Sequence, residues 1–167
     1  MTSRTGTVCY VRAVIQRAID ASVTVDGSTI GAFEGSGLVV LIGITHADDP
    51  TIAARMADKI YGLRIFDAHH APEGVCVPPG SPRELSAGEL GLPVLVISQF
   101  TLYADTRKGR RPTWDNAAPG QVAAPLVEAV IAELRALGTE VATGIFGADM
   151  KVNFTNDGPI TIIIDVD

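Results

Sequence analysis

One apolar segment decides the fold of this chain: Leu38-Val-Val-Leu-Ile-Gly-Ile-Thr45. A run of this kind, with no polar alternation, is typical of a strand that is buried on both faces of a sheet. A second buried strand is predicted further along the chain, from Val94 to Phe100. The two segments place a well-packed sheet at the centre of the molecule.

Shorter strand patterns and two helical patterns surround these central strands. A hairpin is predicted at Asp26-Gly27, which is a strong turn signal between alternating segments. One helix is expected from Pro50 to Gly62, with Asp49 as its N-cap, and another from about Pro119 to Leu137. The other expected strands cover residues 10–18, 22–25, 29–33, 63–66, 140–145, 150–155 and 159–165. Because strands outnumber helices, we expect a sheet-rich, layered α/β domain with two main helices.

Length and composition narrow the class of protein. A chain of 167 residues is most simply one domain, here residues 11–167 after a loose polar tail at residues 1–10. A net charge of -6 argues against indiscriminate nucleic-acid binding, so no DNA partner is expected. The pattern contains no signal peptide and no apolar run of membrane-spanning length. Cys9 and Cys76 have neither metal-like nor redox-like spacing, which favours reduced thiols in a cytoplasmic protein.

The chemistry-bearing stretch begins at the end of the second buried strand, with Ser98, Gln99, Phe100 and Thr101. On a strand, Gln99 and Thr101 would point to the same side. Thr101 could act as a nucleophile if a base such as His46 lay nearby. The simpler alternative is a strand edge with polar residues turned to water and His46 at a helix start. The residues alone leave both interpretations open.

A basic cluster follows at once, formed by Arg107, Lys108, Arg110 and Arg111. On an acidic chain it favours a local contact with phosphates over broad coating of a polyanion. Four contacts on a single strand predict a slope of roughly -3 in log K against log[salt]. The alternative is a solvated turn, although such turns normally mix both signs of charge.

Two other segments are weaker candidates. Asn156-Asp-Gly-Pro159 is most simply a turn, and its alternative is a special Gly-Pro peptide bond that redirects the backbone. The irregular stretch 67–93 is expected to be functional or an insertion. Its side chains Asp67, His69, His70 and Cys76 could ligate a metal, but they lack a recognised spacing. No metal and no cofactor are therefore expected.

Taken together, these strings resemble the D-aminoacyl-tRNA deacylase family. The matching segments run in family order from residue 12 to residue 161, and they are listed here: Arg12 to Arg17, Ala21 to Asp26, Gly43 to His46, Ser98 to Pro112, Val141 to Gly144, Phe146-Gly147, and Asn156 to Thr161. The resemblance implies a three-layer domain with mixed and antiparallel strands. It also implies a homodimeric editing hydrolase that cleaves the ester between a D-amino acid and the acceptor end of tRNA, without a cofactor.

The resemblance assigns roles to particular residues. Ser98, Gln99, Phe100 and Thr101 would form the catalytic wall of the active site. Gly158-Pro159 would be a cis bond inserted into the partner subunit's site, where it excludes L-amino acids by steric clash. Arg17 and Asn156 would support that segment, and the basic cluster would contact the tRNA. Because glycine has no side chain to exclude, glycyl-tRNA mischarged on alanine tRNA should also be cleaved.

The chain departs from the family pattern in its first ten residues, in a lengthened loop 67–93, and at Thr113-Trp114. In that loop Pro82 to Ser86 replaces a family string, so contacts from the loop cannot be carried over. Two other functions remain open from the sequence. One is a non-catalytic module that binds the tRNA end, and the other is a hydrolase with Thr101 as nucleophile.

Overall fold

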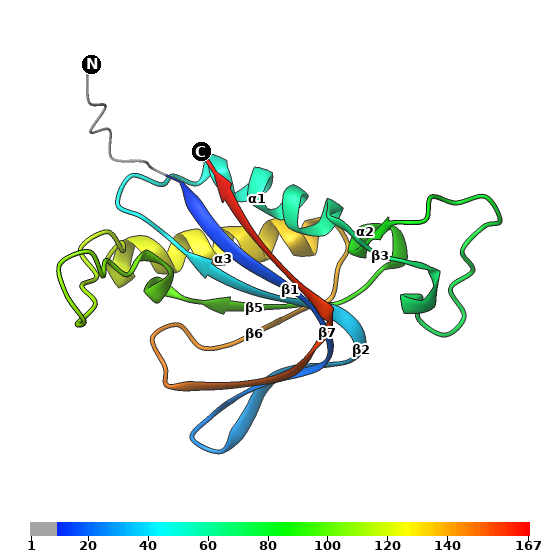
Figure 1. Cartoon of the computed structure of the whole chain (residues 1–167), viewed down its shortest axis with the longest axis horizontal. Helices are drawn as coiled ribbons and strands as arrows, with labels where there is room; N and C mark the ends of the chain where they lie inside the picture. The colour runs from blue at the N-terminus through cyan, green and yellow to red at the C-terminus, as the bar shows by residue number, and fades with distance from the viewer. Residues whose placement is uncertain (1–9) are drawn as a thin grey trace.

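The computed structural model describes residues 10–167, so the predicted tail lies almost wholly outside the described residues. A five-stranded mixed sheet, in the order β6-β5-β2-β1-β7, forms its centre (Figure 1). The strands are β1 (Val11–Val25), β2 (Ser28–Gly43), β5 (Val94–Ser98), β6 (Val141–Thr143) and β7 (Met150–Val166). β2 pairs in parallel with β5, where Leu38 lies opposite Val94. The two apolar segments that were predicted to be buried strands are therefore neighbours in the middle of the sheet.

Two main helices cover one face of this sheet, α1 (Thr51–Gly62) and α3 (Gly120–Ala136). α1 begins one residue later than expected. The Asp49 carboxylate accepts a hydrogen bond from the Thr51 N–H at 2.7 Å, as an N-cap side chain does. α3 ends as predicted before Gly138, which has a φ of +91°. None of the helices within residues 10–167 is long and apolar enough to cross a membrane.

The long strands bend and create a second core on the other face of the sheet. The bend lies where Asp20 of β1 (φ +51°) meets Gly35 of β2 (φ +73°), whose N–H donates to the Asp20 carboxylate at 2.7 Å. Beyond it, Ala21, Val23 and Phe33 pack over Leu95 and Ile97 of β5. Helices, sheet and bent strand halves give the α/β fold its layers, in agreement with the expected fold class.

Some elements differ from the sequence prediction. β7 is one continuous strand where two were expected, because both halves pair with β1 on either side of residues 157–159. The strand at Val94 ends at Ser98, and residues 100–103 form the 3-10 turn η2 (Phe100–Tyr103). The stretch 67–93 is not structureless. It holds η1 (Ala68–His70), β4 (Leu85–Ser86) and α2 (Ala87–Leu90), and β4 pairs with β3 (Arg64–Phe66).

Candidate functional site

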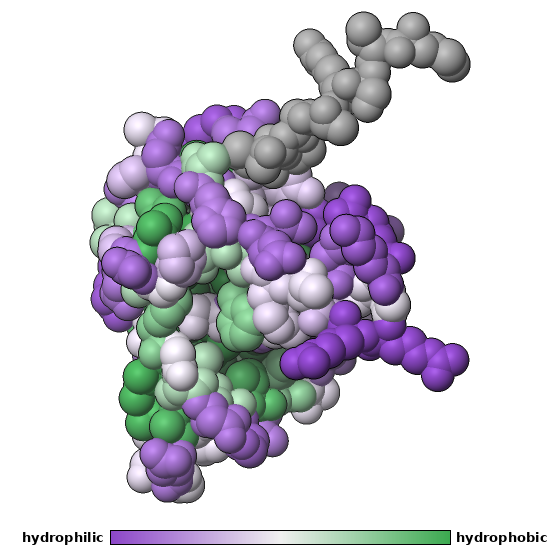
Figure 2. Space-filling model, turned by 90° about the vertical axis from the view of Figure 1, so that its left-hand side faces the viewer, coloured by the Kyte–Doolittle hydropathy of each residue, from purple (hydrophilic) through white to green (hydrophobic). Residues whose placement is uncertain are grey.

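A cavity of about 230 Å³ opens where β5 ends. Ser98, Gln99 and Phe100 form one side, and the loop from Phe146 to Asp149, with Met150 at the start of β7, forms another. The rest of the lining is apolar and comes from β2, α3 and the segments beside them: Ile42, Ile44, Ile97, Ala118, Ala123, Val127 and Val152, together with the backbone of Gly147 and Ala148. Figure 2 shows this end of the molecule, where hydrophobic residues form a recessed surface bordered by hydrophilic ones. An apolar hollow with a few polar groups is the usual form of a ligand site.

The end of β5 determines which groups reach the cavity. The Gln99 N–H donates to the Ile42 carbonyl at 2.7 Å, and the chain then turns into η2. Gln99 and Thr101 consequently do not alternate along a strand as predicted. The turn still brings them together, since Gln99 Nε2 donates to Thr101 Oγ1. Thr101 is not among the residues that line the cavity.

Two exposed aromatic side chains border the cavity. Phe100 is 54% exposed and meets Trp114 edge to face, with 5.2 Å between ring centroids. Phe146 is 42% exposed. The sequence had pointed to Phe100 but gave Phe146 and Met150 no role in the site. A phenylalanine before a glycine in a short loop, here Phe146-Gly147, was the available signal for an exposed aromatic group.

Gly158 and Pro159 lie elsewhere in the protomer. They belong to β7 and are not among the cavity-lining residues that the structure describes. Their peptide bond is trans, as are all others in residues 10–167, which corrects the expected cis bond. Asn156 and Thr161, on either side of this bond, both pair with β1. Gly158 has a φ of +116°, which L side chains rarely adopt.

Arg17 and Asn156, which were predicted to support this segment, both contact it. Arg17 Nε lies 3.0 Å from the Asp157 carboxylate, and Arg17 Nη1 donates to the Ile65 carbonyl at 2.5 Å. Asn156 Nδ2 donates to the carbonyls of Arg17 and Ile160, at 3.0 and 2.9 Å. The segment is thus held from both sides, and a Cβ placed on Gly158 would lie 2.6 Å from Arg17 Nη2.

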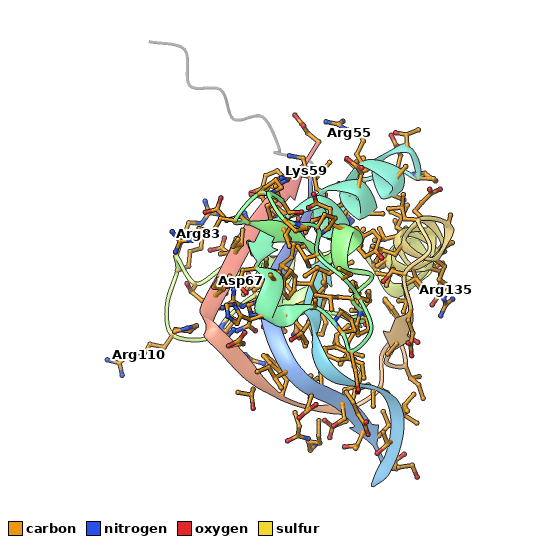
Figure 3. The ribbon with its side chains drawn as sticks, turned by 90° about the vertical axis from the view of Figure 1, so that its right-hand side faces the viewer. Arg55, Lys59, Asp67, Arg83, Arg110 and Arg135 are labelled. Atoms are coloured by element: carbon orange, nitrogen blue, oxygen red, sulfur yellow. The ribbon has the colours of Figure 1, made fainter. Side chains whose placement is uncertain are left out.

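The basic cluster lies on an exposed loop, and Figure 3 shows Arg110 pointing away from the body of the molecule. Its four members are not equivalent. Arg107 makes a close ion pair with Asp105, 2.5 Å from Nη2 to Oδ2. Hydrogen bonds from Arg107 lower the pKa of Asp105 to about 2, so Asp105 is ionised at neutral pH. Lys108, Arg110 and Arg111 make no ion pair within residues 10–167.

A second cavity, of about 510 Å³, lies between this loop and the end of β2. It is lined by Tyr10, Tyr103, Thr45, His46, Ala104 to Arg107, and Asn116. His46 Nε2 contacts the Asp115 carbonyl at 2.9 Å, so the structure pairs His46 with the loop and not with Thr101. Below it, Asp48 accepts from the Thr45 N–H at 2.6 Å, and burial raises the pKa of Asp48.

The candidate metal ligands of the 67–93 stretch do not form a metal site. Asp67 accepts from the His69 N–H at 2.9 Å, its own N–H donates to His70 Nδ1 at 3.1 Å, and Cys76 is exposed. Within residues 10–167 no three side chains of His, Cys, Asp or Glu are placed to hold a metal ion.

Known proteins similar to this chain share its whole described domain. The sequence model of the D-Tyr-tRNA(Tyr) deacylase family matches residues 14–165. Curated D-aminoacyl-tRNA deacylases of Streptomyces coelicolor and Acidothermus cellulolyticus are 53% and 52% identical, over 93% and 94% of this chain and 100% of each relative. A solved c-Myc DNA unwinding element binding protein has a TM-score of 0.76 at 35% identity, covering 92% of this chain and 97% of its own. A probable eukaryotic D-amino acid tRNA deacylase, at 17% identity and also 0.76, shares the fold.

Proposed function

Because the chain belongs to the D-Tyr-tRNA(Tyr) deacylase family, whose curated members are hydrolases, we propose the following reaction and site for it. The protein cleaves the ester of D-aminoacyl-tRNA at the cavity beside Ser98, Gln99 and Phe100, and releases the D-amino acid and tRNA. L-amino acids are rejected by clash with the Gly158-Pro159 segment of a second subunit. A tRNA-editing enzyme acts where aminoacyl-tRNA is used, so the location we propose is the cytoplasm.

One observation carries this proposal. The cavity at Ser98 to Phe100 encloses about 230 Å³, less than the range of about 300–1,000 Å³ typical of ligand sites. In the same protomer, the rigidly held Gly158-Pro159 segment takes no part in it. We expect this arrangement when two subunits complete each other's site: the cavity of one protomer is small, and its Gly158-Pro159 segment lies outside that cavity.

The face of the sheet opposite the helices supports a homodimer. Leu41 of β2, Val14 of β1 and Ile163 of β7 lie in register across it. Ile163 is 62% exposed, and Leu41 and Val14 are half-buried. An apolar row of this kind at the protein surface is typical of a contact with another protein.

The chemistry needs little from side chains. An aminoacyl ester is already activated, and the vicinal 2′-hydroxyl of the terminal ribose can assist its cleavage. The N–H groups of Phe100 and Thr101 open η2, and the first N–H groups of such a turn have no partner within it. Backbone donors in this position can stabilise the developing oxyanion. Thr101 then shapes the wall through its hydrogen bond with Gln99.

The acceptor end of the tRNA has a path to this site. Ile44 and Thr45, the two residues after the end of β2, line the first and the second cavity, respectively. The second cavity leads toward the basic loop, where Lys108, Arg110 and Arg111 are exposed. We therefore place the terminal nucleotides between the cavity and this loop, with phosphates against the exposed basic side chains.

The test is hydrolysis of tRNA charged with D-tyrosine, L-tyrosine or glycine, the last on alanine tRNA. We expect release of the D-amino acid and of glycine, with the L-ester as stable as in buffer. A D-ester that stays intact while the tRNA still binds would replace the proposal with a non-catalytic binding module. Equal cleavage of D- and L-esters would remove the role of Gly158-Pro159.

A further inference from the structure

We propose that His70, in the lengthened loop, is a positioning residue that holds the Asn156–Pro159 segment in place and thereby sharpens the distinction between D- and L-esters. This inference rests on the proposed role of Gly158-Pro159. It concerns a residue that the sequence had considered only as a possible metal ligand.

The contacts of His70 lead directly to the segment. His70 Nε2 lies 3.0 Å from Asp157 Oδ2, across 87 positions of sequence. The same oxygen lies 3.0 Å from Arg17 Nε. Asp157 is the residue before Gly158, so its carboxylate is fixed from two directions immediately beside the glycine. The side chains of His70, Arg17 and Asp157 are only 13%, 14% and 25% exposed.

The hydrogen bonds on the other ring nitrogen orient the imidazole. The Asp67 N–H donates to His70 Nδ1 at 3.1 Å in the capping box of η1. Nδ1 also lies 3.0 Å from Asp67 Oδ1. Because the Asp157 carboxylate can only accept, Nε2 carries a proton and donates to it. The His70 ring also meets Phe66 edge to face, with 5.4 Å between centroids. The η1 turn therefore holds the ring in one orientation.

The mechanical consequence follows from the number of supports. Arg17 Nε contacts the Asp157 carboxylate, but the same Nε also lies 3.3 Å from the Asp157 carbonyl oxygen. Arg17 Nη1 donates to the Ile65 carbonyl. His70 is thus the independent second donor to the carboxylate. Without the His70 contact, Asp157 and the adjoining Gly158 can move more. Discrimination against L-esters by steric clash then falls, although the protein stays folded.

The experiment compares three variants of the full-length protein with D- and L-tyrosyl-tRNA. His70→Phe keeps a ring against Phe66 but removes the donor. His70→Gln restores an N–H near the position of Nε2. His69→Ala is the matched control, since His69 is the next residue of η1 and its side chain is 94% exposed.

We expect His70→Phe to lower the D/L ratio of kcat/KM by about tenfold, mainly by raising cleavage of the L-ester, with the KM for the D-ester little changed. His70→Gln should recover most of the ratio, and His69→Ala should leave it unchanged. Partial unfolding would lower both rates together and leave the ratio intact, so it cannot imitate this result.

The two proposals fail in different ways. A wild-type protein that spares the D-ester overturns the proposed function. A wild-type protein with the expected activity, combined with an unchanged D/L ratio in His70→Phe, overturns only the role of His70. An equal loss in His69→Ala would also overturn it, because the effect would then belong to η1 as a whole.

Discussion

The two proposed walls of the site are built in opposite ways. Ser98 to Thr101 is a local structure, in which a strand ends, one backbone bond to Ile42 fixes the turn, and Gln99 contacts Thr101 two residues away. Asn156 to Pro159 is held by residues from distant parts of the chain, Arg17 at the N-terminal strand and His70 in the lengthened loop. Within the described residues, the first wall lines the cavity of about 230 Å³ and the second wall does not line it.

This difference indicates where precision is needed. The wall at Ser98 presents backbone groups to an ester that is already reactive, and a short turn suffices for that purpose. The wall at Gly158 has to distinguish two stereoisomers by clash, so small displacements matter and several supports converge on it. Substitutions at the second wall should therefore alter selectivity far more than substitutions at the first.

The largest effect is expected from Gly158→Ala. A Cβ here meets Arg17 Nη2 at 2.6 Å and Ile160 Cγ1 at 3.1 Å, and the φ of +116° is strained for alanine. Such strain costs about 1–3 kcal/mol. We expect the D/L ratio to fall on the order of 100-fold, which corresponds to about 2.7 kcal/mol of lost discrimination. Charged-tRNA kinetics and urea denaturation measure the two effects.

Gly27→Ala is the control for backbone strain alone. Gly27 has a φ of +80° in the β1–β2 turn, and nothing lies within 4 Å of an added Cβ. It should lose a similar amount of stability while keeping the D/L ratio. A matching loss of selectivity in Gly27→Ala would mean that the ratio reports stability and not the wall.

The next effect is expected from Arg17→Lys. Lysine keeps the charge but cannot serve both Asp157 and the Ile65 carbonyl with the geometry of a guanidinium fork. We expect the free energy of unfolding to fall by about 1–2 kcal/mol, since one partly buried hydrogen bond is lost. The D/L ratio should fall about tenfold.

Arg12→Lys is its partner control on the same strand. Arg12 also pairs with β7, through Asp165 at 2.8 Å, but it lies away from the Gly158 segment. We expect little change in selectivity. If both lysine variants lowered the ratio alike, the pairing of β1 with β7 in general, and not the hold on Asp157, would set the chirality filter.

The contrast between local and long-range contacts also explains which features could be predicted from the sequence. The buried strands, the Asp26-Gly27 turn and the two helices follow from patterns within a few residues, and the structure has them. Ser98, Gln99 and Phe100 line the cavity, and their catalytic role stays a prediction. Local patterns sufficed wherever local hydrogen bonds decide the structure.

The predictions that were wrong or missing depend on tertiary contacts. Nothing in the string around His70 indicates that its imidazole meets Asp157, because that contact joins segments 87 residues apart. Thr101 was predicted to be a strand residue, whereas β5 ends at Ser98 and Thr101 lies in η2. The prediction divided β7 into two strands at Gly158-Pro159, because those residues usually mark a turn. In the structure, pairing with β1 continues on both sides of them.

The basic loop should affect affinity and leave selectivity intact. Arg110→Ala and Arg111→Ala should each reduce the slope of log K against log[salt] by about 0.7. Arg107→Ala should change it less, because Asp105 already neutralises Arg107. The wild-type slope should then be nearer -2 than the -3 expected for four contacts. Filter binding of tRNA at several salt concentrations measures these slopes.

Asp105→Asn is the complementary variant. It frees Arg107, so we expect tighter binding and a slope steeper by about 0.7. Since the pKa of Asp105 is lowered to about 2, the pair stays ionised from about pH 5 to 8 and the wild-type slope should not change over that range. Arg135→Ala on α3 is the control, because Arg135 and Arg110 lie on opposite sides of the molecule in Figure 3.

The smallest effect on turnover is expected at the residue that first suggested a nucleophile. Thr101 does not line the cavity, and its hydroxyl accepts from Gln99. His46, the base that the sequence offered, contacts the Asp115 carbonyl and is therefore not placed to activate Thr101. Thr101→Ala should therefore retain kcat within about threefold and lose about 1 kcal/mol of stability, with Thr101→Ser close to the wild type. A nucleophile would instead lose on the order of 10⁴-fold or more. Single-turnover kinetics with D-tyrosyl-tRNA separate these outcomes. A trapped acyl-enzyme would show instead that Thr101 acts as a nucleophile. A small effect would mean that the wall at Ser98 acts through its backbone, and that selectivity resides in the segment at Gly158.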